Sequence, residues 1–152
     1  MFCRFIVMLT GKGCGKVPDI TRIDLSRYRM QKAREMLAST KRDMDAEDYA
    51  SANNRAYYAI FHAMRAVLAL DGEDYKKHSA VIARFTLNYL KPEILPREYS
   101  KLISNASLIR NRSDYEDFYI CSVADTNALF FGAESFCAEV EKYLAERYGE
   151  ET

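Results

Sequence analysis

The stretch that decides the fold runs from residue 46 to residue 70 and reads AEDYASANNRAYYAIFHAMRAVLAL. Its apolar side chains recur at positions i, i+3, i+4, i+7, i+10 and i+11, namely Tyr57, Ile60, Phe61, Met64, Val67 and Leu68. This spacing is typical of the buried face of an α-helix. Asp71 and Gly72 follow directly and predict where that helix ends.

The rest of the chain predicts four more helices. Apolar residues at helical spacing favour helices over about 21–43, from His78 onward, over about 96–114 and over about 123–148. We expect Asp24 or Ser26 to cap the first of these helices and Gly149 to end the last. Tyr28 in the first and Leu87 in the third are expected to face the core. With only six Gly and three Pro in the chain, we predict an all-α fold, an antiparallel bundle of about five helices.

The 152 residues are enough for one domain with its own core. Residues 1–20 differ in character from the rest, so we expect a poorly ordered N-terminal extension there and a helical domain over residues 21–149. The apolar segment 1–9 contains Arg4 and is shorter than the roughly 20 residues that span a bilayer. We therefore expect no membrane association and a cytoplasmic location.

The cysteine pattern points to the same compartment. Cys3, Cys14, Cys121 and Cys137 form no C-x-x-C pair, and we expect reduced thiols, with Cys121 and Cys137 on one long helix. His62 and His78 are the only histidines, and no spacing places carboxylates or thiolates beside them as metal ligands. The sequence predicts neither a metal site nor a cofactor.

The charge balance restricts how nucleic acid could be bound. The chain has 22 basic and 22 acidic residues and a formal net charge of zero. Attraction of the whole molecule to a phosphate backbone is therefore weak, and any contact with nucleic acid must come from a local patch.

One such patch is predicted on the helix of residues 46–70. At about 100° per residue, Asn54, Tyr58 and Arg65 project beside the apolar stripe, with Arg55 and His62 further round. A mixture of hydrogen-bonding and aromatic side chains at the edge of a core suits the floor of a groove or a subunit interface. The alternative is hydrogen bonding between helices inside the bundle, and the sequence leaves both interpretations open.

A second polar group is predicted at the end of the helix of residues 96–114. Residues 110–119 read RNRSDYEDFY, and Arg110 and Asp114 are one turn apart, so that they can pair while Arg112 points elsewhere. The planar guanidinium of arginine matches the oxygens of a phosphate. The alternative is a surface salt bridge at a helix end, which contributes little to stability.

These two groups of residues, in this order, resemble those of the HEPN family of helical domains. Residues 54–62 match the pattern Asn-Arg-x-Tyr-Tyr-Ala-x-Phe-His of small stand-alone prokaryotic members. Residues 77–79 match a helix start that contains a histidine, and residues 110–115 are close to Arg-x-x-Ala-Asp-Tyr. The resemblance covers about residues 25–148 and implies a helical bundle that associates with RNA or nucleotides.

The resemblance also implies candidate catalytic residues. In HEPN ribonucleases an Arg and a His, four to six residues apart, meet their copies across a homodimer and cut RNA without a metal. Arg110 and Asn111 match the first part by position, but Tyr115 stands where the His would fall. A tyrosine has a pKa near 10 and is a poor general base at neutral pH. Arg110 and Tyr115 are the implied catalytic pair, with His62 as another source of an imidazole.

The remaining implications concern binding and partners. The residues expected to contact RNA or a nucleotide are Asn54, Arg55, Tyr58, Asn111, Asp114 and His78. Many relatives are homodimers and form toxin–antitoxin pairs with a nucleotidyltransferase, which implies both kinds of partner here. We consider three hypotheses. The first is an RNA-acting protein, in its narrower form a metal-independent endoribonuclease toxin. The second is a non-catalytic module that holds RNA, a nucleotide or a partner protein, and the third is a structural dimer.

Overall fold

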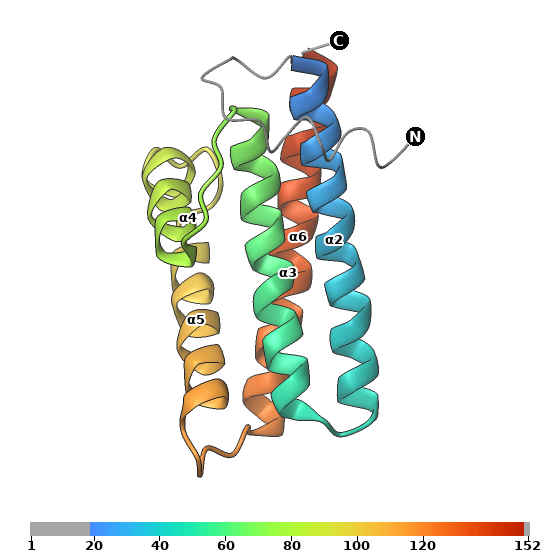
Figure 1. The fold of residues 1–152 in the computed structure, drawn as a ribbon, viewed down its shortest axis with the longest axis vertical. Helices are drawn as coiled ribbons and strands as arrows, with labels where there is room; N and C mark the ends of the chain where they lie inside the picture. Colours follow the sequence, from blue (N-terminus) through green and yellow to red (C-terminus); the bar gives the residue numbers. More distant parts are fainter. Residues whose placement is uncertain (1–18, 151–152) are drawn as a thin grey trace.

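The computed structural model describes residues 19–150, and within them five α-helices and one short π-helical turn follow one another. Their bounds are Asp19–Asp45 for α2, Tyr49–Leu70 for α3, His78–Phe85 for α4, Thr86–Leu90 for η1, Tyr99–Tyr115 for α5 and Val123–Glu150 for α6. Figure 1 shows that the long helices α2, α3, α5 and α6 run along one axis and alternate in direction. The predicted all-α antiparallel bundle is confirmed. The expectation of a poorly ordered extension concerns residues that lie, except for the last two, outside the described range.

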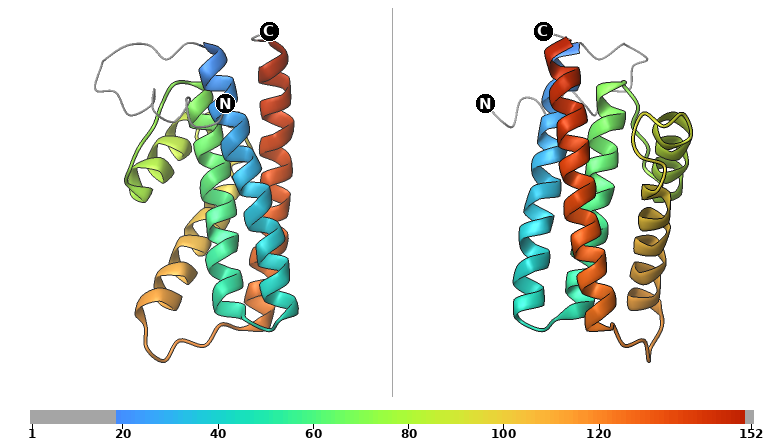
Figure 2. Two further views of the ribbon diagram at one scale, coloured as in Figure 1. Left: turned by 45° about the vertical axis from the view of Figure 1, so that its right-hand side comes forward. Right: turned by 180° about the vertical axis from the view of Figure 1, so that it is seen from behind.

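Helix α3 is central in this arrangement. It packs against α2, α4, α5 and α6, and α2 and α5 lie on opposite sides of it in both Figure 1 and Figure 2. One side of α3 therefore faces outward between α2 on one hand and α4 and α5 on the other. That exposed side is where the predicted polar residues of α3 lie.

The ends of α3 follow from local chemistry. The Asp48 side chain caps the helix, because it accepts a 3.1 Å hydrogen bond from the Ser51 backbone N–H and a 2.7 Å one from the Ser51 hydroxyl. At the other end Gly72 adopts a positive φ of 77°, and the N–H groups of Gly72 and Glu73 bond to the carbonyls of Ala69 and Leu68. The predicted stop at Asp71–Gly72 is confirmed.

The core is built around the predicted stripe of α3, whose six residues are all buried. The other helices contribute buried apolar side chains to the same cluster, including Met30 and Ala33 of α2, Val81, Phe85, Tyr89 and Leu90 of α4 and η1, Ile103, Ala106 and Ile109 of α5, and Leu129, Phe136, Val140 and Leu144 of α6. Tyr28 and Leu87 were expected in the core, but they are 51% and 50% exposed. Leu87 lies in the π-helical turn η1, where Tyr89 and Leu90 point inward in its place.

Three further local predictions were wrong. Helix α2 begins at Asp19, so neither Asp24 nor Ser26 caps it; Ser26 is buried and donates a 2.7 Å hydrogen bond to the Ala66 carbonyl. Helix α6 continues through Gly149 to Glu150. Cys121 precedes α6, because the Ser122 side chain accepts from the Asp125 N–H at the start of that helix. Both cysteines are free thiols, Cys121 in the connection between α5 and α6 and Cys137 within α6.

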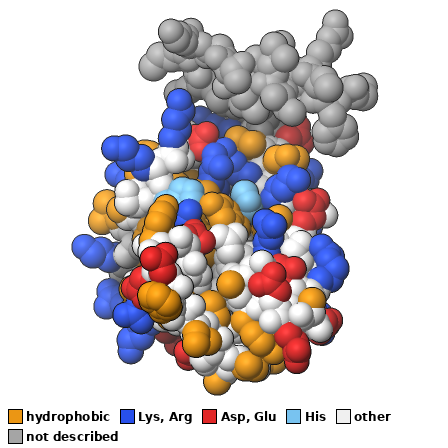
Figure 3. All heavy atoms as spheres, turned by 60° about the horizontal axis from the view of Figure 1, so that its bottom comes forward, with side chains coloured by type: hydrophobic (Ala, Val, Ile, Leu, Met, Phe, Trp, Pro, Cys, Tyr) orange, Lys and Arg blue, Asp and Glu red, His pale blue; other side chains and the backbone are white. Residues whose placement is uncertain are grey.

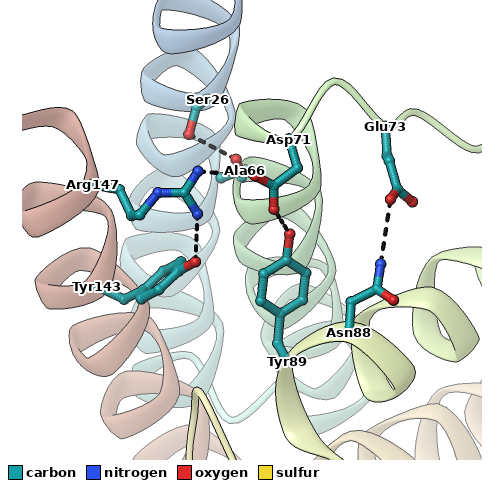
Figure 4. A network of polar contacts seen from close by, with 8 residues as sticks. All are labelled: Ser26, Ala66, Asp71, Glu73, Asn88, Tyr89, Tyr143 and Arg147. Atoms are coloured by element: carbon teal, nitrogen blue, oxygen red, sulfur yellow. Dashed lines mark hydrogen bonds and ion pairs between the residues drawn. The ribbon is translucent and has the colours of Figure 1, made fainter. Parts of the chain in front are cut away.

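A polar network joins four elements at the C-terminal end of α3 (Figure 4). Arg147 of α6 donates to Asp71 Oδ1 at 2.9 Å and to the Tyr143 hydroxyl at 2.7 Å. Tyr89 of η1 donates to the same Asp71 carboxylate. Ser26 ties α2 to α3 in the same region. These bonds fix the start of the α3–α4 connection, which leads to His78 at the first position of α4.

No helix among residues 19–150 combines the length and the apolar character that crossing a membrane requires.

Candidate functional site

The outward side of α3 carries a strip of four partly exposed residues, Asn54, Tyr58, His62 and Arg65, which we call the α3 strip. Their spacing of four, four and three residues places them along one side of the helix. The strip borders the buried stripe, so its side chains lie at the edge of the core. On the face drawn in Figure 3, histidine and hydrophobic side chains are exposed together, with Lys and Arg side chains around them.

Arg110 of α5 lies over the tyrosines of α3. Its guanidinium carbon is 5.2 Å from the centre of the Tyr57 ring and 5.7 Å from that of Tyr58. Its Nε is 3.3 Å from Asp114 Oδ2, an ion pair between residues one turn apart, as predicted. This Nε is buried and makes no hydrogen bond. The guanidinium is thus held by two aromatic faces and one carboxylate.

His78 completes the group around Arg110. Its Nδ1 lies 3.0 Å from the Tyr57 hydroxyl, and its ring stacks on Phe61 with centroids 4.1 Å apart. Burial lowers the pKa of His78, and the positive charges of Arg110 and Arg65 lower it further. His78 is therefore a neutral imidazole at neutral pH, held in place by a hydrogen bond and a stacked ring beside a cation.

His62 has a different environment. Burial, followed by the charges of Arg65, Arg29 and Lys32, lowers its pKa to about 4, against a smaller opposing effect of Glu35. Arg29, Lys32 and Glu35 belong to α2, so apart from Arg65 the charges that affect His62 come from that helix. The structure brings His78, rather than His62, into the neighbourhood of Arg110.

A groove of about 210 Å³ lies between the first turns of α3 and the last turn of α5. It is lined by Ala50, Ser51, Asn54, Arg55, Ser113 and Asp114. The fold thus brings together three predicted binding residues. Asn54 and Arg55 are neighbours in the sequence, and Asp114 lies about 60 positions further on. Asp114 also pairs with Arg110, so the groove adjoins the Arg110 group.

Asn111 and Tyr115 lie elsewhere on α5. Both are exposed, and Tyr115 is 78% exposed at the last position of the helix. Tyr115 follows Arg110 by five positions. At about 100° per residue, the Tyr115 side chain points about 140° away from that of Arg110 around the helix axis. Within one chain the structure therefore does not place Tyr115 beside Arg110.

Sequence reasoning missed two parts of this arrangement. Tyr57 was expected only as a core residue, yet its ring supports Arg110 and its hydroxyl meets His78. Arg29 was not considered, although its guanidinium is bonded to Asp74 and to the Arg65 carbonyl. The adjacent tyrosines 57 and 58 were a usable signal, because neighbouring rings on a helix can both reach one cation. Nothing in the local sequence marks Arg29.

The described residues contain no group of three or more His, Cys, Asp or Glu side chains that could hold a metal ion.

Comparison with known proteins identifies the class of domain. The sequence profile of the HEPN domain matches residues 26–143. A UPF0332 protein of Thermotoga maritima is 30% identical over 117 residues, which cover 77% of this chain and 89% of that protein. The chain belongs to the HEPN domain family.

Two relatives from Methanocaldococcus jannaschii are named as putative toxins. One is 30% identical over 114 residues, 75% of this chain and 84% of that protein. The other is 27% identical over 115 residues, 76% of this chain and 78% of that protein.

Proposed function

We propose that this protein binds RNA through the Arg110 group and acts in the cytoplasm as the toxin of a HEPN–nucleotidyltransferase toxin–antitoxin pair. The observation that carries the proposal is the Arg110 guanidinium, which lies over two tyrosine rings next to a groove and has the partly exposed Asp114 as its carboxylate partner. The names of the two Methanocaldococcus jannaschii relatives support the toxin role.

The surroundings of Arg110 suit a phosphate group. A guanidinium presents a planar fork of donors that matches phosphate oxygens, and charged hydrogen bonds are the stronger ones. Its carboxylate partner Asp114 is one turn away and its side chain is 33% exposed. An ion pair in contact with solvent contributes little, so a phosphate can compete for the same guanidinium at small cost.

Catalysis is the narrower part of the proposal. We propose a metal-independent endoribonuclease in which Arg110 engages the scissile phosphate and His78 takes the place of the motif histidine. His78 is the imidazole whose pKa the Arg110 charge affects. Tyr115 is 78% exposed and would contribute from the surface. A homodimer that brings two Arg110 groups to one cleft would add a second guanidinium to the same phosphate.

A non-catalytic module is the second candidate. It is favoured by Tyr115, which replaces the motif histidine and is turned away from Arg110 within one chain. Such a module would hold RNA, a nucleotide or the nucleotidyltransferase through the same residues without breaking a bond.

The binding part is tested by replacing one arginine at a time on α5. Arg112 is a matched control for Arg110, because it lies on the same helix and also pairs with a carboxylate one turn away, Glu116, at 3.7 Å. Binding of a fluorescent single-stranded RNA is measured by anisotropy at fixed salt. We expect Arg110→Gln to weaken binding about tenfold or more, as the loss of a charged hydrogen bond predicts. We expect Arg112→Gln to change it by less than about threefold. Equal losses in the two variants would contradict the proposal.

The catalytic part is tested in the presence of a chelator with Arg110→Gln and a second variant, His78→Gln. The ribonuclease is supported if the parent chain cleaves RNA and both variants do not. Binding without cleavage in the parent chain, as a monomer or a dimer, selects the non-catalytic module.

A further inference from the structure

A second group of cations lies at the other end of the α3 strip. Arg29 of α2 and Arg65 of α3 both contact Asp74 of the α3–α4 connection, and both contact the same oxygen, Oδ1, at 3.0 and 2.8 Å. Arg29 also donates a 3.2 Å hydrogen bond to the Arg65 carbonyl. Two guanidinium groups thus converge on one carboxylate oxygen.

The carboxylate does not balance the two charges. The Arg29 side chain is 8% exposed, whereas that of Asp74 is 59% exposed and therefore well hydrated. Burial and the repulsion from Arg65 lower the pKa of Arg29, although Asp74 acts in the opposite direction. The same two arginines contribute to the low pKa of His62. A positive potential that suppresses the protonation of a neighbouring imidazole favours the binding of an anion.

Arg65 is the accessible member of the pair, because its side chain is 27% exposed. Its guanidinium carbon lies 5.8 Å from the centre of the Phe61 ring. His78 stacks on the same ring, so aromatic side chains extend from the Arg110 group to Arg65.

We propose that Arg29 and Arg65 form a second phosphate site, so that single-stranded RNA lies along the α3 strip with one phosphate at Arg110 and another at Arg65. The inference rests on the proposed function, since it assigns the substrate class of that same surface. Tyr58 belongs to the Arg110 group, and His62 lies on the strip between Tyr58 and Arg65. From Tyr58 to Arg65 the helix rises about 10 Å. A mononucleotide cannot bridge that separation, whereas a chain of a few nucleotides can.

The test is a length series of oligouridines with one, two and four nucleotides, measured by calorimetry against the parent chain and Arg65→Gln. We expect the parent to bind the tetranucleotide at least about tenfold more tightly than the mononucleotide, because the longer ligand reaches a second guanidinium. In Arg65→Gln we expect this gain to shrink severalfold. Arg65→Lys, which keeps the charge but loses the fork, should recover part of the gain.

Arg97→Gln is the control for the loss of a positive charge, because Arg97 is paired with Glu93 at 3.6 Å just before α5 and away from the strip. The His62 imidazole provides a second readout by NMR: bound tetranucleotide should raise its pKa in the parent chain, since a phosphate opposes the charges of Arg65 and Arg29. A length gain that is the same in the parent and in Arg65→Gln overturns the second site alone. A protein that binds no oligouridine overturns the proposed function as well.

Discussion

The two histidines flank one tyrosine, and burial and the charge of Arg65 lower the pKa of both, but different groups hold them in place. Tyr58 is 6.2 Å from the ring centre of His62 and 5.9 Å from that of His78. His78 is held by neutral partners, the Tyr57 hydroxyl and the Phe61 ring. His62 lies in the field of Arg65, Arg29 and Lys32. Two residues of one type on one surface therefore differ in what fixes them.

This difference assigns them different tasks. A side chain that is fixed by a hydrogen bond and a stacked ring keeps its position when a ligand arrives, which suits a group that must act at a set distance from Arg110. A side chain whose protonation is controlled by nearby cations responds to any change in their charge. We therefore expect His78 to suit positioning or proton transfer. We expect the pKa of His62, which burial and then nearby cations lower, to change when an anion binds.

The largest expected effect is on stability, and it separates the two residues directly. Replacing His78 with Leu leaves the Tyr57 hydroxyl, in a residue that is 1% exposed, without its partner. An unsatisfied buried group of this kind costs about 1–3 kcal/mol. His62→Leu should change the free energy of unfolding by less than about 0.5 kcal/mol at pH 7.5, as for a substitution outside the packed core. Urea unfolding of both variants measures this, and equal losses would remove the distinction between the two histidines.

A smaller effect is expected in acid. The pKa of His62 is about 4 in the folded chain and near 6.5 in the unfolded one. Between these values the unfolded state binds more protons, so stability is fully present above about pH 6.5 and is lost as the pH falls toward 4. His62→Leu removes this contribution. Relative to the parent chain, the variant should gain about 1 kcal/mol at pH 5 compared with pH 7.5, after allowance for solvent screening.

The measurement is urea unfolding of the parent chain and His62→Leu at both pH values. The lowered pKa of His78 acts in the same direction, so some loss of stability in acid should persist in the variant. A difference between the two chains that does not change with pH would show that burial and the neighbouring cations do not lower the pKa of His62.

The sequence predicted the parts of this surface that depend on neighbours along one helix. The α3 stripe, its end at Gly72 and the Arg110–Asp114 pair all follow from spacing within a few turns, and all are confirmed. The side of α3 on which Asn54 and Tyr58 lie follows in the same way.

The parts that were missed depend on how the helices pack. His78 reaches Tyr57 because the network at Asp71 fixes the start of the connection before α4. Arg29 meets Arg65 only because α2 packs beside α3. Leu87 was expected in the core because it is apolar, but it follows buried Phe85 by two positions and lies on the other side of the chain, 50% exposed. None of these contacts leaves a mark in the local sequence.

The smallest expected effect concerns the residue that stands in place of the motif histidine. Tyr115 is 78% exposed at the end of α5, and within one chain it takes no part in the Arg110 group. Tyr115→Phe removes only a solvated hydroxyl, so we expect RNA affinity, measured by anisotropy, to change by less than about twofold and stability by less than about 0.5 kcal/mol. A loss of tenfold or more would mean that this phenol, brought in by a partner chain, completes the site. In that case His78 would be a structural residue, and the contrast between the two histidines would no longer describe how the site works.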